Sequence, residues 1–237
     1  MKSLILLCLA TSSVFGQSFL NAQLQYAHVR TAHNEKDSAL KALSRQKGLP
    51  YPPRSLYFRA FKNEAQLEAW SQMARKDSFI LLASYPICSS SGVAGPKIQA
   101  GDGQVPEGVY NISVFNPLSS YYLSLGVSYP NTVDRARSAG KNTGGDIFIH
   151  GDCVTIGCIP LTDDKIKEVY LLAVRARANG QQTIPIHIFP SRLTQSYIRA
   201  NPAHTGLWSQ LKNIYDRFEA TRRKLRVSTS NSGYKLE

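Results

Sequence analysis

The chain has 237 residues and a formal net charge of +12, with 28 Lys and Arg residues against 16 Asp and Glu. This length fits one large domain or two small ones, and no stretch of linker-like composition divides it. A basic surface favours solubility and attraction to anionic envelope polymers. No nucleic-acid-binding motif accompanies the charge, so we expect no nucleic-acid partner.

The first 16 residues have the order of a secretory signal peptide: Lys2, an apolar run over residues 4–10, and a small polar stretch that ends at Gly16. We predict cleavage before Gln17, with Ala10 marking an earlier alternative site. The apolar run is shorter than the roughly 20 residues that a membrane-spanning helix needs, and no later stretch qualifies. The mature protein is therefore expected to be exported, periplasmic or in the cell envelope, without stable membrane insertion.

The first half of the mature chain alternates between helix and strand patterns. Residues 21–48 are polar with interspersed Ala and Leu and end at Gly48 and a proline-rich joint, which predicts a helix. Residues 56–61 alternate like a strand, whereas residues 62–77 predict a helix, because Leu67, Trp70 and Met73 recur at helical spacing. Residues 79–87, 108–116 and 121–130 are rich in β-branched and aromatic residues and predict strands.

The second half continues the alternation. Residues 146–150 predict a short strand ending at His150, and Thr162 caps a helix whose apolar stripe continues to Gly180. Residues 183–190 predict a strand and residues 207–218 a terminal helix, whereas the polar tail from Arg226 is expected to pack loosely. Together the elements indicate an α+β fold with an antiparallel or mixed central sheet.

Residues 149–161, IHGDCVTIGCIPL, contain one histidine and two cysteines. A zinc site is one interpretation, but structural zinc needs four ligands and His187 and His204 are remote, so we expect no metal. A second interpretation is structural: Cys153 and Cys158 are small buried residues, or they form a disulfide with each other or with Cys88. If Cys158 is a catalytic thiol, oxidation that joined it to Cys153 would inactivate the enzyme. Removal of the signal peptide leaves an odd number of cysteines, so at least one has no intramolecular partner.

The glycines favour a third interpretation, a thiol nucleophile with its base. Gly157 allows a tight turn immediately before Cys158, and such a turn can direct backbone N–H groups toward an oxyanion. His150 ends a strand nearby, within reach of the thiol if the loop folds back. An imidazole in that place takes the thiol proton and leaves the reactive thiolate.

Three segments resemble one protein family. Residues 144–164, GGDIFIHGDCVTIGCIPLTDD, resemble the catalytic signature of the YkuD-type L,D-transpeptidases, a His-Gly followed by Ser/Thr-x-Gly-Cys. Residues 94–112, AGPKIQAGDGQVPEGVYNI, are similar to a second family segment, and residues 121–136, YYLSLGVSYPNTVDRA, resemble the YafK-like branch. The resemblance spans residues 56–190.

The resemblance implies a cysteine acyltransferase or hydrolase that acts on peptidoglycan stem peptides through a thioester acyl-enzyme and needs no cofactor. Its mostly β catalytic domain, with a sandwich- or barrel-like sheet, would cover residues 54–190, between a helical segment (17–53) and a C-terminal helical extension and tail (191–237). By motif position, Cys158 is the nucleophile and His150 the base. The Gly151 carbonyl would orient the imidazole, and the N–H groups of Gly157 and Cys158 would be the oxyanion donors.

Three residues outside this signature are candidates for substrate binding. Lys97 precedes the Gly-Asp-Gly turn that the resemblance places along the groove, although glycine and proline at that density also simply build turns. Arg135 can bind a stem-peptide carboxylate with its guanidinium fork, whereas Arg137 fits a solvated loop. Tyr129 lies in the Ser-Tyr-Pro segment that resembles the branch.

Two departures from the common family pattern bear on the reaction. Ile156 replaces the second histidine of most members, and His150 and Cys158 are only eight positions apart (150 to 158). Both features suit the YafK-like branch, which is associated with hydrolysing the bond between peptidoglycan and an attached lipoprotein. We therefore expect hydrolysis of a link between diaminopimelate and a D-amino acid or an attached protein, with stem peptides and a wall-attached lipoprotein as partners.

Three alternatives stay open. An L,D-transpeptidase would pass the acyl group to an amine and form cross-links or attach protein. A non-catalytic cell-wall-binding module would keep a groove but would not need a reactive thiol. A cysteine peptidase of another fold would use Cys and His but would not account for the Gly-Asp-Gly and Ser-Tyr-Pro segments.

Overall fold

The computed structural model describes residues 17–74 and 76–237. The predicted signal peptide, residues 1–16, lies outside this range. Within it, no helix has both the length and the apolar character needed to cross a membrane.

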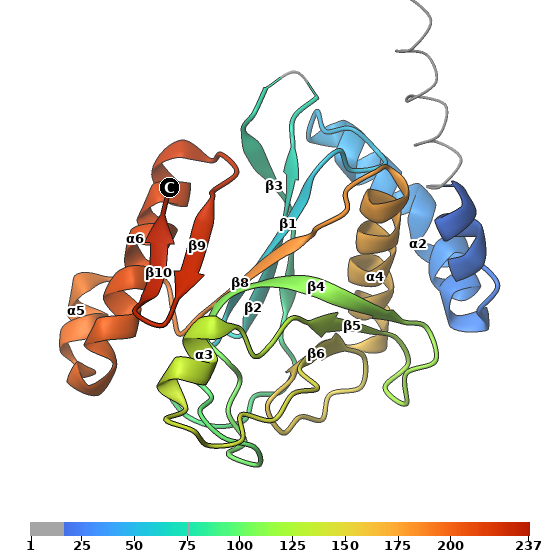
Figure 1. The fold of residues 1–237 in the computed structure, drawn as a ribbon. Helices are drawn as coiled ribbons and strands as arrows, with labels where there is room; N and C mark the ends of the chain where they lie inside the picture. Colours follow the sequence, from blue (N-terminus) through green and yellow to red (C-terminus); the bar gives the residue numbers. More distant parts are fainter. Residues whose placement is uncertain (1–16, 75) are drawn as a thin grey trace, which may run out of the picture.

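An eight-stranded mixed sheet runs through the molecule in the order β3-β2-β1-β8-β4-β5-β6-β7 (Figure 1). The pairs β1–β8 and β6–β7 are parallel, and the other pairs are antiparallel. The order places β6 and β7, which flank the predicted catalytic loop, at one edge of the sheet. The strands are β1 Leu56–Phe61, β2 Gln66–Gln72, β3 Phe79–Pro86, β4 Gly108–Asn116, β5 Ser124–Val127, β6 Phe148–His150, β7 Ile159–Pro160 and β8 Pro185–Phe189.

Two long helices lie on one side of the sheet, α2 (Ala27–Gln46) and α4 (Asp163–Ala178) (Figure 1). Both helices were expected from the sequence, and α4 begins after the predicted N-cap Thr162. The buried face of α4 packs on the sheet, and α2 packs on α4. Ion pairs reinforce the helix pair, including Arg175 with Asp37 at 2.6 Å and Lys36 with Glu168 at 3.6 Å. This layer supports the catalytic loop, because α4 follows directly after β7.

The C-terminal elements lie on the other side (Figure 1). They comprise α5 (Gln195–Arg199), a 3-10 turn (Pro202–His204), α6 (Thr205–Thr221) and a hairpin of β9 (Val227–Ser230) and β10 (Gly233–Leu236). The expectation of a loosely packed tail is wrong. Val227, Tyr234 and Leu236 pack against the apolar cluster of α6, and Asn131 Nδ2 donates to the Tyr234 hydroxyl at 2.9 Å. Packing on α6 therefore holds this polar segment in a hairpin.

The helix predicted over residues 62–77 is also wrong. Ala65 adopts φ of +47° in the turn after β1, and β2 then pairs with both β1 and β3. Both faces of β2 are buried, and its residues alternate polar and apolar only over positions 66–69, because the β2–β3 register shifts between Ala69 and Trp70. The shift leaves Leu67, Trp70 and Met73 at helical spacing, which is why the segment resembled a helix.

The α+β class with a large curled, mostly β centre and helices from both ends of the chain is confirmed.

The short helix α3 (Thr132–Arg137) follows β5 and is capped by Asn131, whose side chain accepts from two backbone N–H groups. Core residues extend through the sheet and α4 as one continuous cluster. The sheet edge that carries the signature residues is therefore fixed to the core rather than suspended in a loop.

Candidate active site

The two signature residues lie at the same edge of the sheet because β6 and β7 pair in parallel. Ile149 is opposite Ile159 and His150 is opposite Pro160, so the loop between the strands must return to the start of β6. That return brings Cys158 beside Phe148, whose N–H donates to the Cys158 sulfur at 3.4 Å. The fold-back that the sequence analysis required for contact between loop and strand is present.

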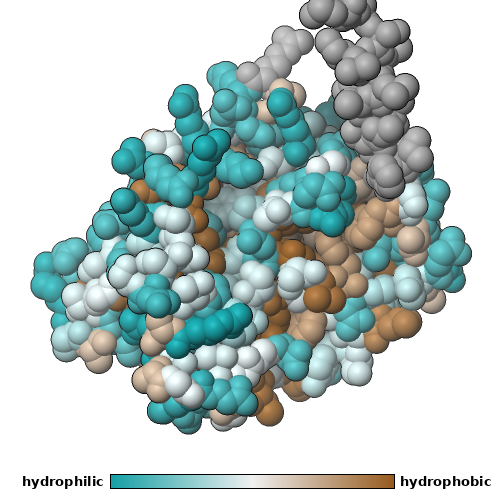
Figure 2. Space-filling model, viewed as in Figure 1, coloured by the Kyte–Doolittle hydropathy of each residue, from teal (hydrophilic) through white to brown (hydrophobic). Residues whose placement is uncertain are grey.

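Cys158 and His150 line one cavity of about 480 Å³ at this edge of the sheet. Its wall comes from the end of β4 and the turn after it, from β5 and β6, and from the loop before β7. Figure 2 shows hydrophobic residues gathering over β4 and β5 on the visible face, with hydrophilic residues around them. Ile156 lines the cavity and is 85% exposed. The remaining lining residues are Asn116, Ser119, Ser120, Tyr121, Ser124, Asp146, Phe148, Val154 and Thr155.

His150 is held in one orientation. Its Nδ1 donates to the Gly151 carbonyl at 2.5 Å, which leaves Nε2 without a proton and available as a base. Burial lowers the pKa of His150 below its ordinary value of 6.5, and the Gly151 contact only partly opposes this shift. The Tyr121 ring lies against the imidazole, with centroids 4.7 Å apart. The imidazole is therefore neutral at neutral pH, as a general base must be.

Cys158 is half-buried and is the free thiol among the described cysteines. Burial raises the pKa of its thiol above the ordinary 9.0, while the Phe148 N–H and the charge of Lys97 act in the opposite direction. Its S–H donates to the Asp146 carbonyl at 3.5 Å. Both shifts favour the uncharged forms of the pair, a thiol and a neutral imidazole.

The turn after His150 is held by a residue that the sequence analysis did not assign to the site. Asp163, the first residue of α4, accepts the Asp152 N–H at 2.9 Å while Asp152 adopts φ of +58°. A Cβ at Gly151 would lie 2.5 Å from the same carboxylate oxygen and 2.8 Å from the Tyr121 carbonyl. Only glycine therefore fits at 151, and Asp163 fixes the carbonyl that orients the imidazole.

The two amides predicted as oxyanion donors are each bonded to a hydroxyl. Gly157 N–H donates to Ser91 Oγ at 2.7 Å, and Cys158 N–H donates to Thr155 Oγ1 at 2.8 Å. The Thr155 hydroxyl in turn donates to the Cys158 carbonyl at 3.0 Å. Gly157 has φ of +106°, and a Cβ there would lie 2.9 Å from the Gln104 carbonyl oxygen, so the turn requires glycine.

The disulfide differs from the redox hypothesis drawn from the sequence. Cys153 is bonded to Cys88, with a Cα–Cα distance of 5.5 Å, and the bridge to Cys158 is therefore wrong. The pairing follows from topology, because Cys88 lies just after β3 and its N–H donates to the Pro160 carbonyl of β7 at 3.1 Å. Such long-range neighbours cannot be read from spacing, and the result leaves Cys158 unblocked.

The three predicted substrate-binding residues do not line the cavity that holds Cys158 and His150. Lys97 is buried and donates to Asp102 at 2.6 Å. Tyr129 is buried, and its hydroxyl donates to the Thr143 carbonyl at 3.1 Å. Arg135 is exposed on α3.

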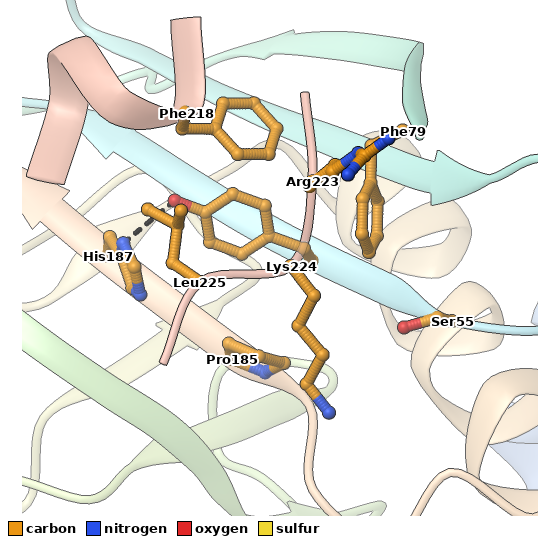
Figure 3. Close-up of a pocket in the computed structure, with 9 residues that line it drawn as sticks. Ser55, Phe79, Pro185, His187, Phe218, Arg223, Lys224 and Leu225 are labelled. Carbon is orange, nitrogen blue, oxygen red and sulfur yellow. Dashed lines mark hydrogen bonds between the residues drawn. The ribbon is translucent and has the colours of Figure 1, made fainter. Parts of the chain in front are cut away.

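A second, small cavity of about 20 Å³ lies between β1, β8 and the segment after α6 (Figure 3). Its floor is a buried pair in which the Tyr57 hydroxyl contacts His187 Nδ1 at 2.8 Å. Burial lowers the pKa of His187 to about 3. His187 lines a different cavity from His150 and Cys158. Among the described residues, no group of three or more His, Cys, Asp and Glu side chains could hold a metal ion.

Comparison with known proteins places this geometry in a family. A family model described as the L,D-transpeptidase catalytic domain (YkuD) matches residues 69–186. The chain is 36% identical over 183 residues to the Escherichia coli K12 protein named "Putative L,D-transpeptidase YafK", covering 76% of this chain and 72% of that relative. Fold, signature and relatives together define an L,D-transpeptidase-type catalytic domain. The chain belongs to the L,D-transpeptidase catalytic-domain family.

Two solved structures were also matched, each with a TM-score below 0.5. The helical cell shape determining protein Pgp2 from Campylobacter jejuni (K307A mutant) is 17% identical, with a TM-score of 0.47 over 78% of each chain. Bd1075 of Bdellovibrio bacteriovorus is 18% identical, with a TM-score of 0.40 over 74% of this chain and 75% of that one.

Proposed function

We propose that the protein is an exported cysteine enzyme that hydrolyses a link in peptidoglycan, between diaminopimelate of a stem peptide and either a D-amino acid or an attached lipoprotein. The observation that carries the proposal is the cavity of about 480 Å³ that both Cys158 and His150 line, with Nδ1 of His150 bonded to the Gly151 carbonyl. Membership of the L,D-transpeptidase family supports peptidoglycan as the substrate. Export is supported by the signal-like order of residues 1–16.

Acylation begins when Nε2 of His150 accepts the thiol proton as the Cys158 sulfur attacks the carbonyl carbon beside the diamino acid. The S–C bond forms, and the carbonyl π electrons move onto oxygen. As they return, the C–N bond breaks, and the imidazolium gives its proton to the leaving amine. The products of this step are a thioester on Cys158 and a free amine.

Deacylation repeats the cycle with water. Nε2 of His150 takes one proton from a water whose oxygen attacks the thioester carbon. The C–S bond then breaks, the imidazolium protonates the Cys158 thiolate, and the carboxylic acid leaves. An amine in place of that water would give a cross-link or an attached protein instead, so the acceptor decides between hydrolase and transpeptidase.

Ile156 supports water as the acceptor. It stands 85% exposed on the wall of the cavity, at the position where most family members have a second histidine. An apolar side chain offers no hydrogen bond to position an acceptor amine. The relative named "Putative L,D-transpeptidase YafK" matches most of the chain, which supports the resemblance to the YafK-like branch. The preference for hydrolysis comes from that branch resemblance.

The predicted substrate residues take different parts in this proposal. The Lys97 ammonium is paired with Asp102, so it acts on the Cys158 thiolate through its charge rather than by binding the stem peptide. Tyr129 supports the loop near residue 143. Arg135 is exposed on α3, outside the cavity, and would bind a carboxylate of a distant part of the stem peptide.

The test is to incubate the protein with purified wall, with and without covalently attached lipoprotein, in a large excess of acceptor amine. We expect mainly water-cleaved products by mass spectrometry, and no products with Cys158→Ala, whose fold should be unchanged because Cys158 borders a solvent-filled cavity. Predominant amine-linked product would instead identify a transpeptidase. Binding to wall without turnover would identify a binding module.

A further inference from the structure

The oxyanion that forms during attack needs a hydrogen-bond donor, and the two nearest amides are already used. Gly157 N–H donates to Ser91, and Cys158 N–H donates to Thr155. The Thr155 hydroxyl cannot replace them, because it donates to the Cys158 carbonyl. Since each oxyanion-hole donor usually contributes a factor of about 10² to 10³ to kcat, a further group whose proton has no acceptor would add to catalysis.

A small cavity of about 30 Å³ adjoins Cys158, separate from the large cavity that holds His150. This volume admits one or two water-sized groups, which suits a carbonyl oxygen rather than a whole side chain. The polar side chains along it are Lys62 and three consecutive serines, Ser89, Ser90 and Ser91. These four residues are the side-chain candidates for a donor if the oxyanion forms on this side of Cys158.

Lys62 is not available for this role. Its ammonium has three protons, and four acceptors already surround it within hydrogen-bonding distance. They are the carbonyls of Val93, Gly95 and Val105 and the buried carboxylate of Glu107. Lys62 therefore holds the 93–107 loop in place and contributes only its positive charge to the cavity.

Ser91 is the serine that contacts the catalytic turn. Its Oγ accepts the Gly157 N–H at 2.7 Å, and within the described chain its own proton has no acceptor. A hydroxyl that accepts a hydrogen bond becomes a stronger donor, because the two bonds polarise each other. The Gly157 amide thus acts through Ser91 rather than directly.

The geometry points to Ser91 as the oxyanion donor of this enzyme: its hydroxyl, fixed by the Gly157 amide, hydrogen-bonds the substrate carbonyl oxygen in the small cavity beside Cys158. The inference rests on the proposed acyl transfer. Ser91 keeps its proton throughout, and the bond strengthens when negative charge reaches the oxygen and weakens when the carbonyl re-forms. The residue thereby favours the transition state over the bound substrate.

Covalent and backbone contacts fix the loop that carries Ser91. The Cys88–Cys153 disulfide joins its start to the loop between His150 and Cys158. Beyond Ser91, the Val93 N–H donates to Gln104 Oε1 at 3.0 Å. A donor held on both sides costs little reorganisation during the reaction, which is what makes such a hydrogen bond effective.

The experiment compares two reactions of Cys158 in Ser91→Ala. Acyl transfer from a stem peptide passes through an oxyanion, whereas alkylation by iodoacetamide at Cys158 does not, although both need the thiolate. We expect kcat/KM for stem-peptide cleavage to fall about 10²-fold, with alkylation rates across pH 6–10 unchanged. Ser91→Thr, which keeps Oγ, should recover much of the loss.

Ser90→Ala is the matched control, because Ser90 lines the same cavity and makes no hydrogen bond to the catalytic turn. It should retain wild-type rates in both reactions. Equal losses of cleavage and alkylation in Ser91→Ala would mean that Ser91 only holds the turn, and unchanged cleavage would mean that it has no role; either outcome overturns the inference. Cleavage by Cys158→Ala, or none by the wild type, would instead overturn the proposed function.

Discussion

At the scale of single residues, the environments of Cys158 and His150 predict the pH dependence of the reaction. Burial lowers the pKa of His150 below 6.5 and raises that of Cys158 above 9.0. Since the active form has a neutral imidazole and a protonated thiol, kcat/KM should reach half its plateau on the acid side below pH 6.5 and stay flat through neutrality. Steady-state cleavage between pH 4 and 10 measures this profile.

His150→Gln provides the control for this assignment. Without the base, the acid limb should disappear, activity should fall about 10²-fold or more, and the residual rate should rise only as the thiol itself ionises in alkaline solution. An acid limb centred at pH 7 or above in the wild type would contradict the direction of the His150 shift. It would indicate instead that the contacts of the imidazole favour its protonated form more than burial opposes it.

The site residues that could be predicted from the sequence are those that lie close together along the chain. His150 and Cys158 belong to one signature motif, and the Gly151 contact follows because Gly151 is the next residue after His150. Ser91 lies 66 residues before Gly157, and the sequence offers no spacing that relates them. Tyr121 reaches His150 only because β5 pairs with β6, so its role also depended on knowing the register.

At the scale of elements, the Cys88–Cys153 disulfide connects the end of β3 to the catalytic loop and should control both stability and activity. The bridge closes a loop of 65 residues. Chain-entropy reasoning gives a loss of about 2–4 kcal/mol on its removal, and the Ser91–Gly157 contact should loosen with it. We expect Cys88→Ser with Cys153→Ser to lower the melting temperature and to reduce cleavage while leaving Cys158 free to alkylate.

Thermal unfolding and cleavage rates, each with and without a dithiol reductant, measure this effect. Reductant should lower the melting temperature and the cleavage rate of the wild type toward those of the double variant. It should leave both quantities unchanged in the double variant. Melting temperatures are compared in a Cys158→Ala background, so that thiol exchange with the nucleophile does not contribute. An enzyme whose cleavage rate is the same with the bridge reduced would show that the loop is fixed without it.

The sequence predicted β1 and β4 with their observed bounds, although β1 is buried along its whole length, and α4 begins where its cap indicated. The prediction of β2 failed because a register shift between Ala69 and Trp70 interrupts its polar–apolar alternation and leaves apolar residues at helical spacing. The β9–β10 hairpin was missed because its packing partner α6 becomes visible only in the folded chain.

At the scale of the whole molecule, buried charges join the C-terminal elements to the sheet. Arg59 of β1 is 1% exposed and pairs with Glu68 of β2 and Glu219 of α6, each at 2.7 Å. Its guanidinium also lies 4.9 Å from the Trp70 ring centroid and 4.8 Å from that of Phe218. Removing one partner of a buried ion pair destabilises a fold strongly, because the other charge stays buried without compensation. The C-terminal extension is therefore an integral layer of the fold.

A second buried group, Asp134 of α3, links three distant parts of the chain. Its carboxylate accepts from the Tyr110 hydroxyl of β4 at 2.9 Å and from the Asn131 N–H at 2.8 Å. Asn131 also donates to Tyr234 of the C-terminal hairpin. Burial raises the pKa of Asp134 to about 6, and its hydrogen bonds and the charges of Arg135 and Arg137 only partly oppose the shift.

The raised pKa makes stability depend on pH in a stated direction. The folded protein holds the Asp134 proton more tightly than the unfolded chain, whose ordinary pKa is 3.8, so this contribution is full below about pH 4 and is lost as pH rises through about 6. Relative to Asp134→Asn, which cannot ionise, the wild type should lose about 3 kcal/mol of unfolding free energy between pH 4 and 7. Urea unfolding of both proteins across this range measures the difference, and the comparison cancels the titration of other groups. A difference that is constant with pH, or that grows in favour of the wild type, would mean that the carboxylate is fully ionised in the fold and that its hydrogen bonds outweigh burial.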